Sequence, residues 1–564
     1  MTAPDCTKEL SAPLRCEASD SHVPARDILV RDFRQIFHWP LALYQPDTDL
    51  SKLKTWQPPH PWIEQPDPCA ERLRDKYEEA VYFHDFVQSF LYFDDQGLKR
   101  WVRNDIATLH AHGDSFGFTF DICFEVEFLE LTLFRRTGVA VIALGLKAAQ
   151  PVSLAEAQTA IDLMRRVFPG FWTAGNEAGL VPDLVRVKTA DGKEESWRPQ
   201  PQDIARQHFE ADHVPLLLPW WRMIASGLRL RGDAPPGPIW RHVVDERLPV
   251  MSYLSLDCTD MTEQQAIRRI RPGDWHRIAS ADSAGSDAFP YNPDFLDRLT
   301  PPIFYDRFMP NGEQGSAARQ TYTGYHHAII GAGWFFDNIL IKHFQNHYRQ
   351  MNLIAQMEFA AMLTFSRRLT DLVAAGEQDH DPHAFRRKLL DIRRDFLTFI
   401  HRYHFTDVSN HLQAREMNDR LRAAMGLDRL RAEVEAEIGA ASDFALALDQ
   451  ADATRAQSRL SVVATIFLPA TLAVGFGGMN IIAPVGSEVP MAEVVDLSRG
   501  LLWAGLSYLA AVLVLWFFGR SRRPIREEQS PTEGRLLMAT GGLSAVFLGG
   551  AVIALAVAKG ILGG

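Results

Sequence analysis

The sequence predicts an α/β cytoplasmic domain followed by long stalk helices and then by α-helical transmembrane segments. Three observations support this fold class. Apolar and polar side chains alternate along residues 124–134, which is typical of a strand with one buried face. From residue 331 the chain changes to long stretches with the apolar spacing of helices. Near the C-terminus, three runs carry no charge, and each has the length of about 20 residues that crosses a bilayer core as a helix.

The composition excludes several classes of protein. The 564 residues include 59 Lys and Arg against 70 Asp and Glu, a net charge of −11. This balance argues against a nucleic-acid partner, because such proteins need a basic face. No apolar run follows basic residues near the N-terminus, so we expect no signal peptide and a cytoplasmic N-terminal part. The cysteines form no CxxC pair, which predicts neither a disulfide framework nor a zinc site. They are Cys6, Cys16, Cys69, Cys123 and Cys258.

The N-terminal part divides into a tail and a domain. We expect a mobile N-terminus over residues 1–29 and the α/β domain over residues 30–330. The clearest element of the domain is a hairpin, with strands at residues 124–134 and 139–146. The alternation slips at Phe128–Leu129, which predicts a β-bulge there.

Helical signals follow the hairpin. Ser153 and Glu156 have the spacing of a capping box, which predicts a helix that runs to about Phe168. The stalk is expected over residues 331–460, with a break at Gly426. Its predicted helices cover about residues 334–375, about residues 383–404, and the chain from about residue 407 onward.

The three charge-free runs define the expected membrane part. In chain order it comprises a transmembrane helix at 461–482, an external loop at 483–499, a second transmembrane helix at 500–518, a cytoplasmic loop at 519–535 and a third transmembrane helix at 536–558. The loop after the second helix holds five arginines, whereas the loop before it holds only Arg499 as a base. Because cytoplasmic loops are rich in Lys and Arg, this predicts a multi-pass protein of the cell inner membrane with an external C-terminus. The third run has the alternative of a hydrophobic hairpin or an interfacial helix.

Polar and small side chains follow one face of the helix that enters the membrane. The stripe recurs every three or four residues as Thr454, Gln457, Ser461, Ala464, Leu468, Thr471 and Gly475, and Leu468 is its one large apolar member. Unsatisfied polar groups are costly in hydrocarbon, so this stripe requires a physical cause. One candidate cause is close packing between helices through small residues. The other is a water-lined pore, with Leu468 as an apolar constriction.

The end of this helix resembles a known family. The stretch Ile466–Asn480, IFLPATLAVGFGGMN, is similar to the signature of the CorA family of divalent-cation channels, which ends in Gly-Met-Asn. The segment Phe405–His411, FTDVSNH, resembles the start of the stalk helix in that family. The resemblance covers residues 335–518 and implies a CorA-like homopentamer in membrane lipid with the first membrane helices around a pore. It also implies that Mg²⁺ is the transported ion, with Co²⁺ or Ni²⁺ as alternatives.

The resemblance also implies roles for individual residues. Gly478, Met479 and Asn480 would form the selectivity site, where a ring of Asn480 amide oxygens accepts hydrogen bonds from the waters of hydrated Mg²⁺. Asp407 and Asp443 match cytosolic carboxylates that bind regulatory Mg²⁺. The acids of the external loop would concentrate cations before entry; they are Glu488, Glu493 and Asp496. No organic cofactor and no catalysed reaction are expected.

The same residues are also compatible with simpler roles. Gly-Met-Asn is a usual end of a helix, and the carboxylates also suit a solvated surface. Gly477 stands where the family has an aromatic residue, and the chain has a third charge-free run. A CorA-like zinc transporter is therefore one alternative function. A membrane-anchored cytoplasmic sensor that does not conduct is another.

Overall fold

The structure is a computed structural model, and it divides the chain into two compact units, residues 1–441 and residues 442–564. The residues that it describes are 22–44, 50, 53, 55–65, 79–93, 97–172, 178–199, 217–230, 238–286, 289–309, 317–378 and 382–478, with isolated positions between 502 and 552.

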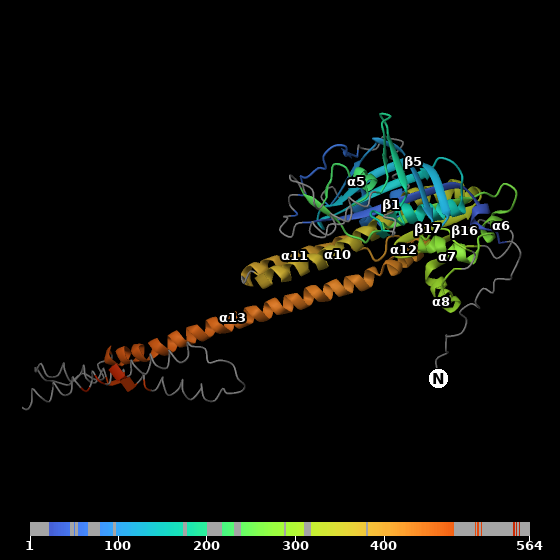
Figure 1. Ribbon diagram of the computed structural model, residues 1–564. Helices are drawn as coiled ribbons and strands as arrows, with labels where there is room; N and C mark the ends of the chain where they lie inside the picture. The colour runs from blue at the N-terminus through green and yellow to red at the C-terminus, as the bar shows by residue number, and fades with distance from the viewer. Residues whose placement is uncertain are drawn as a thin grey trace, which may run out of the picture. The chain divides into compact units, whose positions relative to one another are not determined.

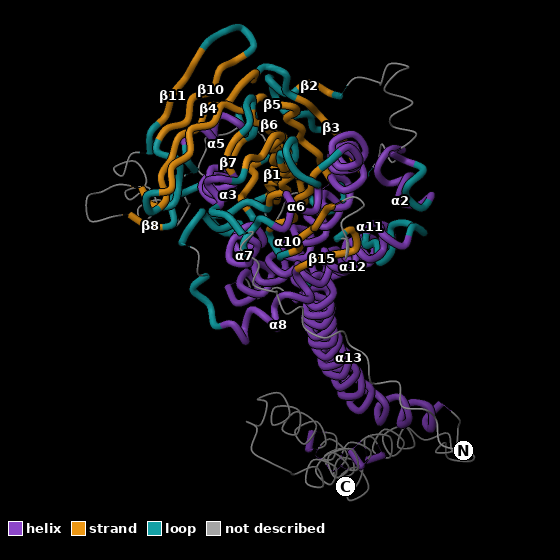
Figure 2. The backbone as a smooth tube through the Cα atoms, turned by 90° about the vertical axis from the view of Figure 1, so that its right-hand side faces the viewer, coloured by secondary structure: helices purple, strands orange, loops and turns teal. Residues whose placement is uncertain are grey.

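A mixed sheet of 15 strands dominates the first unit (Figures 1 and 2). Its main path runs β11-β10-β4-β5-β6-β1-β14-β17-β16-β15, and all neighbours along it are antiparallel except the parallel pair β14–β17. The strands of the main path are β1 (Leu29–Leu43), β4 (Ile106–Ser115), β5 (Phe118–Phe134), β6 (Val139–Ala148), β10 (Leu184–Thr189), β11 (Glu194–Trp197), β14 (Val250–Leu256), β15 (Phe304–Phe308), β16 (Ala317–Tyr322) and β17 (His326–Ala332).

Shorter strands extend this sheet. They are β2 (Ile63–Glu64), β3 (Leu98–Val102), β7 (Val152–Ser153), β12 (Arg229–Leu230) and β13 (Ile239–His242). A separate pair consists of β8 (Phe171–Trp172) and β9 (Ala178–Gly179).

The predicted hairpin is confirmed as β5 and β6, which pair antiparallel over ten residues of register. The bulge lies between Val126 and Phe128, slightly before the predicted position. A close contact accounts for the glycine opposite it, because a Cβ at Gly145 would come within 2.3 Å of Cε1 of Phe128. The aromatic ring therefore occupies the space that a side chain would need, and it fixes how the two strands face each other.

Helices cover both faces of the central strands. The odd-numbered residues Phe33, Phe37 and Trp39 of β1 belong to the apolar core that includes α3 (Leu154–Met164). The even-numbered His38 of the same strand lines a cavity with residues of α10 (Arg349–Gln378), so α10 lies on the opposite face. The capping box that starts α3 is confirmed, with the Ser153 side chain accepting from the Glu156 amide at 3.2 Å. Because both faces of β1 are covered, every residue from 35 to 42 of this strand is buried.

The remaining helices of the first unit lie around the sheet. They are α2 (Asp85–Gln88), α5 (Pro219–Ile224), α6 (Glu263–Arg268), α7 (Pro272–Ser280), α8 (Pro293–Ile303) and α9 (Ile341–His343), with single-turn π segments at Ser89–Phe93, Phe336–Leu340 and Phe344–Tyr348 and a 3₁₀ turn at Ala25–Asp27.

Three long helices and one shorter one follow the sheet. Helix α10 is followed by α11 (Pro382–Tyr403), and the two extend side by side away from the sheet (Figure 1). Helix α12 (Leu412–Met425) ends at Gly426, which has the left-handed φ of 64°. Helix α13 (Leu427–Gly478) begins directly after it and is 52 residues long. The predicted break at Gly426 is therefore present.

The predicted fold class is wrong. The sequence predicted an α/β domain with stalk helices, transmembrane segments and the arrangement of a CorA-like homopentamer, whereas the structure has a large mixed sheet of 15 strands with helices. Within the described residues, no helix is both long enough and apolar enough to cross a membrane. The error has two physical causes. Strands buried on both faces lose the alternation that identifies strands, and a signature of fifteen residues determines no fold for the four hundred residues before it.

Candidate functional site

The predicted pore-lining residues lie on helix α13. Thr454, Gln457, Ser461, Ala464 and Thr471 are all exposed, and their spacing of three, four and seven places them on one face. Leu468, Gly475 and Gly478 also belong to the helix. The Thr454 hydroxyl donates to the Gln450 carbonyl oxygen at 2.7 Å, so its polar group is satisfied within its own helix.

Several predicted site residues lie outside the described residues. These are Met479 and Asn480 of the selectivity site, and Glu488, Glu493 and Asp496 of the external loop. Asn480 follows the last residue of α13 by two positions. The structure thus describes α13 as far as Gly478, the first residue of the Gly-Met-Asn tripeptide, together with the exposed residues on one face of this helix.

A buried ion pair holds the helices that precede α13. Glu358 of α10 is only 1% exposed, and it accepts from Nη1 of Arg422 at 2.7 Å. The Phe405 amide donates to the other Glu358 oxygen at 3.0 Å, and Arg422 Nη1 also donates to the Phe405 carbonyl oxygen at 2.9 Å. The carboxylate therefore has a charged partner and a backbone partner, as a buried charge requires.

The same guanidinium reaches the first turn of α13. Nη2 of Arg422 donates to Oδ1 of Asp428 at 2.7 Å. Burial alone would lower the pKa of Arg422, but the charge of Glu358 and the bond to Asp428 outweigh it and raise the pKa. The bond from Arg422 lowers the pKa of Asp428. One side chain of α12 thus connects α10, the chain before α12 and the start of α13. We call Glu358, Arg422 and Asp428 the Arg422 network.

The two predicted regulatory carboxylates have different surroundings. Asp407 accepts from Nε of Arg415 at 3.0 Å and from the Ser409 amide at 3.3 Å, and Nε2 of His84 lies 3.8 Å away. Both of its oxygens are therefore engaged by neighbours of the same chain. Asp443 is exposed on α13. Among the described residues, no group of three or more His, Cys, Asp or Glu side chains could hold a metal ion.

Three buried histidines form a feature that the sequence did not reveal. His38, His326 and His327 are each at most 2% exposed, and burial lowers the pKa of each to about 3. Nδ1 of His327 accepts from Asn352 at 3.0 Å, and its Nε2 lies 3.1 Å from Oε1 of Gln320. The three rings are neutral at physiological pH, and the bond between His327 and Asn352 joins β17 to α10. The sequence shows the pair in the apolar run HHAIIGA of β17, but histidine spacing alone does not indicate burial.

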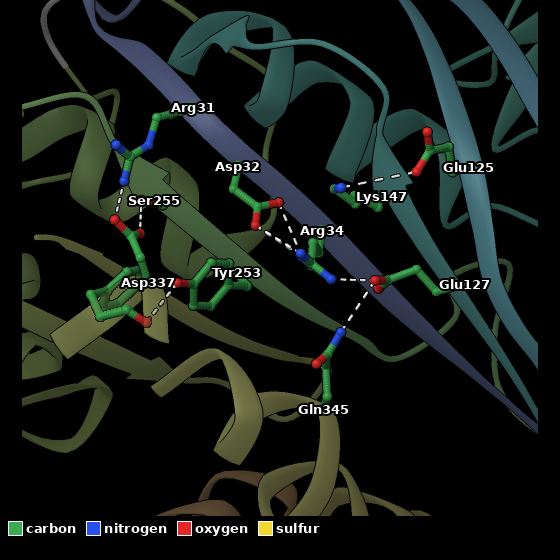
Figure 3. A network of polar contacts seen from close by, with 11 residues as sticks. Arg31, Asp32, Arg34, Glu125, Glu127, Lys147, Tyr253, Ser255, Asp337 and Gln345 are labelled. Atoms are coloured by element: carbon green, nitrogen blue, oxygen red, sulfur yellow. Dashed lines mark hydrogen bonds and ion pairs between the residues drawn. The ribbon is translucent and has the colours of Figure 1, made fainter. Parts of the chain in front are cut away.

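A second polar network fixes the chain after β17 against the sheet (Figure 3). Arg34 of β1 contacts Asp32 at 2.9 Å and also pairs with Glu127 of β5. Asp337 pairs with Arg31 and accepts from Ser255 of β14 at 2.5 Å. Burial is the main cause that raises the pKa of Glu127.

The charges of this second network nearly balance, with two arginines among three carboxylates. Each carboxylate has a guanidinium partner. These ion pairs stabilise the junction between the sheet and the helices.

Comparisons with known proteins found no relative. No protein-family model matches the chain, and no curated protein matches its sequence.

Proposed function

We propose that the protein transports divalent cations across a membrane, with Mg²⁺ as the expected ion and Co²⁺ or Ni²⁺ as alternatives. One observation carries the proposal. The face formed by Thr454, Gln457, Ser461, Ala464 and Thr471 is exposed along a single helix, α13, that ends two residues before Asn480. A long exposed face of small and polar residues suits contact with water or with other copies of the same helix.

The chemistry of hydrated Mg²⁺ fits such a face. The ion gives up its waters reluctantly, so a selective site binds the hydrated ion through hydrogen bonds. Neutral amide and hydroxyl oxygens accept those bonds without holding the ion too tightly for conduction. In the proposed pore, Asn480 forms the ring at the mouth, Thr471 forms a second polar ring and Leu468 forms the constriction. The pore needs several copies of the chain, five according to the sequence resemblance, and it catalyses no reaction.

The regulatory part of the proposal favours Asp443 over Asp407. A cation at Asp407 would have to displace the guanidinium of Arg415, which lies 3.0 Å from the carboxylate. Asp443 is exposed and available to solvent cations. Regulation by internal Mg²⁺ would require that the ion bind one state of the protein more tightly than the other.

The test is flux into liposomes that contain the purified full-length protein. We expect Mg²⁺ entry with the wild-type chain, and we expect Asn480→Ala to abolish the entry or its selectivity. Asn338→Ala is the matched control, because Asn338 is exposed and its amide donates to the Trp334 carbonyl oxygen at 2.8 Å, far along the chain from Asn480. Equal flux in Asn480→Ala and the wild type would remove Asn480 from the mechanism.

The same assay separates the alternatives. Entry of Zn²⁺ without Mg²⁺ would support a zinc transporter. No entry of any cation would overturn the proposal and favour a membrane-anchored sensor that does not conduct.

A further inference from the structure

Helix α11 has one face that is buried inside the protein. Leu389, Ile392, Phe396 and Phe399 are buried against α10. The ring of Phe365 on α10 lies 5.4 Å from that of Phe396 and 5.8 Å from that of Phe399, measured between ring centroids. This face accounts for the position of α11, so its opposite face is free for another role.

The opposite face combines leucines with arginines. Leu390 and Leu397 are 52% and 46% exposed, although leucine is a residue that proteins usually bury. Two pairs of arginines lie seven residues apart along the helix, and so do the two leucines. This spacing of two helical turns places all six side chains on one stripe of the helix. We call this stripe the basic face of α11. It consists of Arg386, Arg387, Leu390, Arg393, Arg394 and Leu397.

The charges of the basic face are only partly neutralised. Over residues 382–403, the chain has six Lys or Arg and two Asp, although the whole protein has a net charge of −11. Asp395 pairs with Arg368 of α10 at 2.9 Å, and Asp391 pairs with Arg394 at 3.1 Å. Among the residues that the structure describes, Arg387 and Arg393 form no ion pair, and both are exposed.

The basic face is an open surface. Both leucines lie on it beside Arg393 and Arg394. A partner on this surface would meet apolar carbon and guanidinium groups at the same time.

We propose that the basic face of α11 docks on an anionic lipid surface. Its leucines would enter the boundary of the acyl chains, and its arginines would bind headgroup phosphates through their planar N–H donors. Charge complementarity supports this occupant, because unpaired bases on an acidic protein fit a surface of negative phosphates above hydrocarbon. A protein partner fits less well, since a stable interface usually takes about 20–30 residues on each side, whereas this stripe has six.

This inference rests on the proposed function in one respect, namely that the protein works at a membrane. Its test measures hydrogen exchange in α11 rather than ion flux. The full-length protein is reconstituted in vesicles of phosphatidylcholine alone or of phosphatidylcholine with phosphatidylglycerol, and hydrogen exchange is followed in peptides that cover residues 386–398. We expect slower exchange in the anionic vesicles, and we expect high salt to remove the difference because it screens charges at a surface.

Variants assign the effect to the basic face. The double variant Arg387→Glu/Arg393→Glu should lose the protection, since each base near an anionic surface strengthens binding about fivefold. Leu390→Ser/Leu397→Ser should reduce the protection in anionic vesicles at low salt. The control is Arg26→Glu/Arg429→Glu, which changes the net charge equally at side chains that are 79% and 82% exposed. It should leave exchange in α11 unchanged.

The outcomes separate this inference from the proposed function. Equal exchange in neutral and anionic vesicles would overturn the inference, even if cations flow. Protection that is already complete in detergent would indicate a second copy as the occupant and would also overturn it. Anionic protection without any cation flux would support the inference and contradict only the transport function.

Discussion

The residue pair Glu358 and Arg422 has the largest predicted effect on stability. The two side chains are 1% and 5% exposed, and they hold each other at 2.7 Å. Glu358→Gln leaves the buried Arg422 with Asp428 as its charged partner, so it should lower the free energy of unfolding by about 3 kcal/mol, the lower end of the range for a broken buried ion pair. Guanidinium denaturation followed by tryptophan fluorescence measures this loss.

Two further variants test the physical reason for this loss. Glu433→Gln removes the partner of Arg429 in a pair of which both side chains are more than half exposed, and it should cost less than about 1 kcal/mol. Glu358→Leu/Arg422→Met removes both buried charges and should recover much of the stability. A double variant as unstable as Glu358→Gln would show that the contacts of the pair with the backbone matter more than its charges.

The buried histidines predict that stability depends on pH. The pKa of His38, His326 and His327 is lowered to about 3 in the folded chain, against about 6.5 in an unfolded one. The unfolded state therefore binds more protons between these values, so stability is complete above pH 6.5 and is lost as the pH falls toward 3. Each histidine adds a slope of up to about 1.4 kcal/mol per pH unit.

Unfolding at a series of pH values between 4 and 8 measures this slope. His38→Gln should reduce it by up to about 1.4 kcal/mol per pH unit, because that histidine no longer titrates. His401→Gln is the control, since His401 is exposed on α11. An unchanged slope in His38→Gln would show that the acid sensitivity arises elsewhere.

At the scale of elements, the junction between α12 and α13 depends on one glycine. Gly426 has a φ of 64°, a conformation that side chains with a Cβ disfavour. Gly426→Ala should therefore cost about 1–2 kcal/mol. Gly439→Ala is the matched control within α13, where an added Cβ meets nothing within 4 Å, and it should stabilise the helix by about 0.5–1 kcal/mol. Denaturation of both variants gives the sign of each change, and equal signs would contradict the role of Gly426.

The elements that the sequence predicted are those with a local signal. The hairpin of β5 and β6 shows alternation, and the capping box of α3 lies within four residues. Strand β14 and strand β17 gave no such signal, because every residue in each is buried and the period of two disappears. Most of the sheet could therefore not be predicted.

The same distinction applies to the candidate site, where local spacing could be predicted and contacts between distant residues could not. The exposed face of α13 follows from helical spacing, which the sequence shows directly. The Arg422 network does not follow from local spacing, because Glu358 and Arg422 are 64 residues apart and meet only after the helices pack. The Arg415 that engages Asp407 is eight residues away, beyond the start of α12, and no spacing rule links them.

For the whole molecule, the exposed face of α13 predicts an assembly of several copies. In a single chain this part of α13 stays exposed, including Leu460, which is 70% exposed, so the isolated helix gains little stability from packing. Copies that pack through these residues would bring their backbones close together. The mass of the purified protein, corrected for bound detergent, should therefore equal several chains, and five chains would agree with the sequence resemblance.

Cross-linking tests which face of α13 meets the other copies. In a chain whose native cysteines are replaced by serine, Ala464→Cys should form disulfide-linked dimers under mild oxidation, because Ala464 lies on the face with Thr454 and Ser461. Ala451→Cys is the matched control, since Ala451 is also an exposed alanine of α13 and lies about 140° around the helix from Ala464. Gel electrophoresis without reducing agent measures the yield of each. Equal yields at both positions would show that the copies have no preferred face, and a yield that is higher at Ala451 would place the polar face of α13 away from the centre of the assembly and would contradict a pore along it.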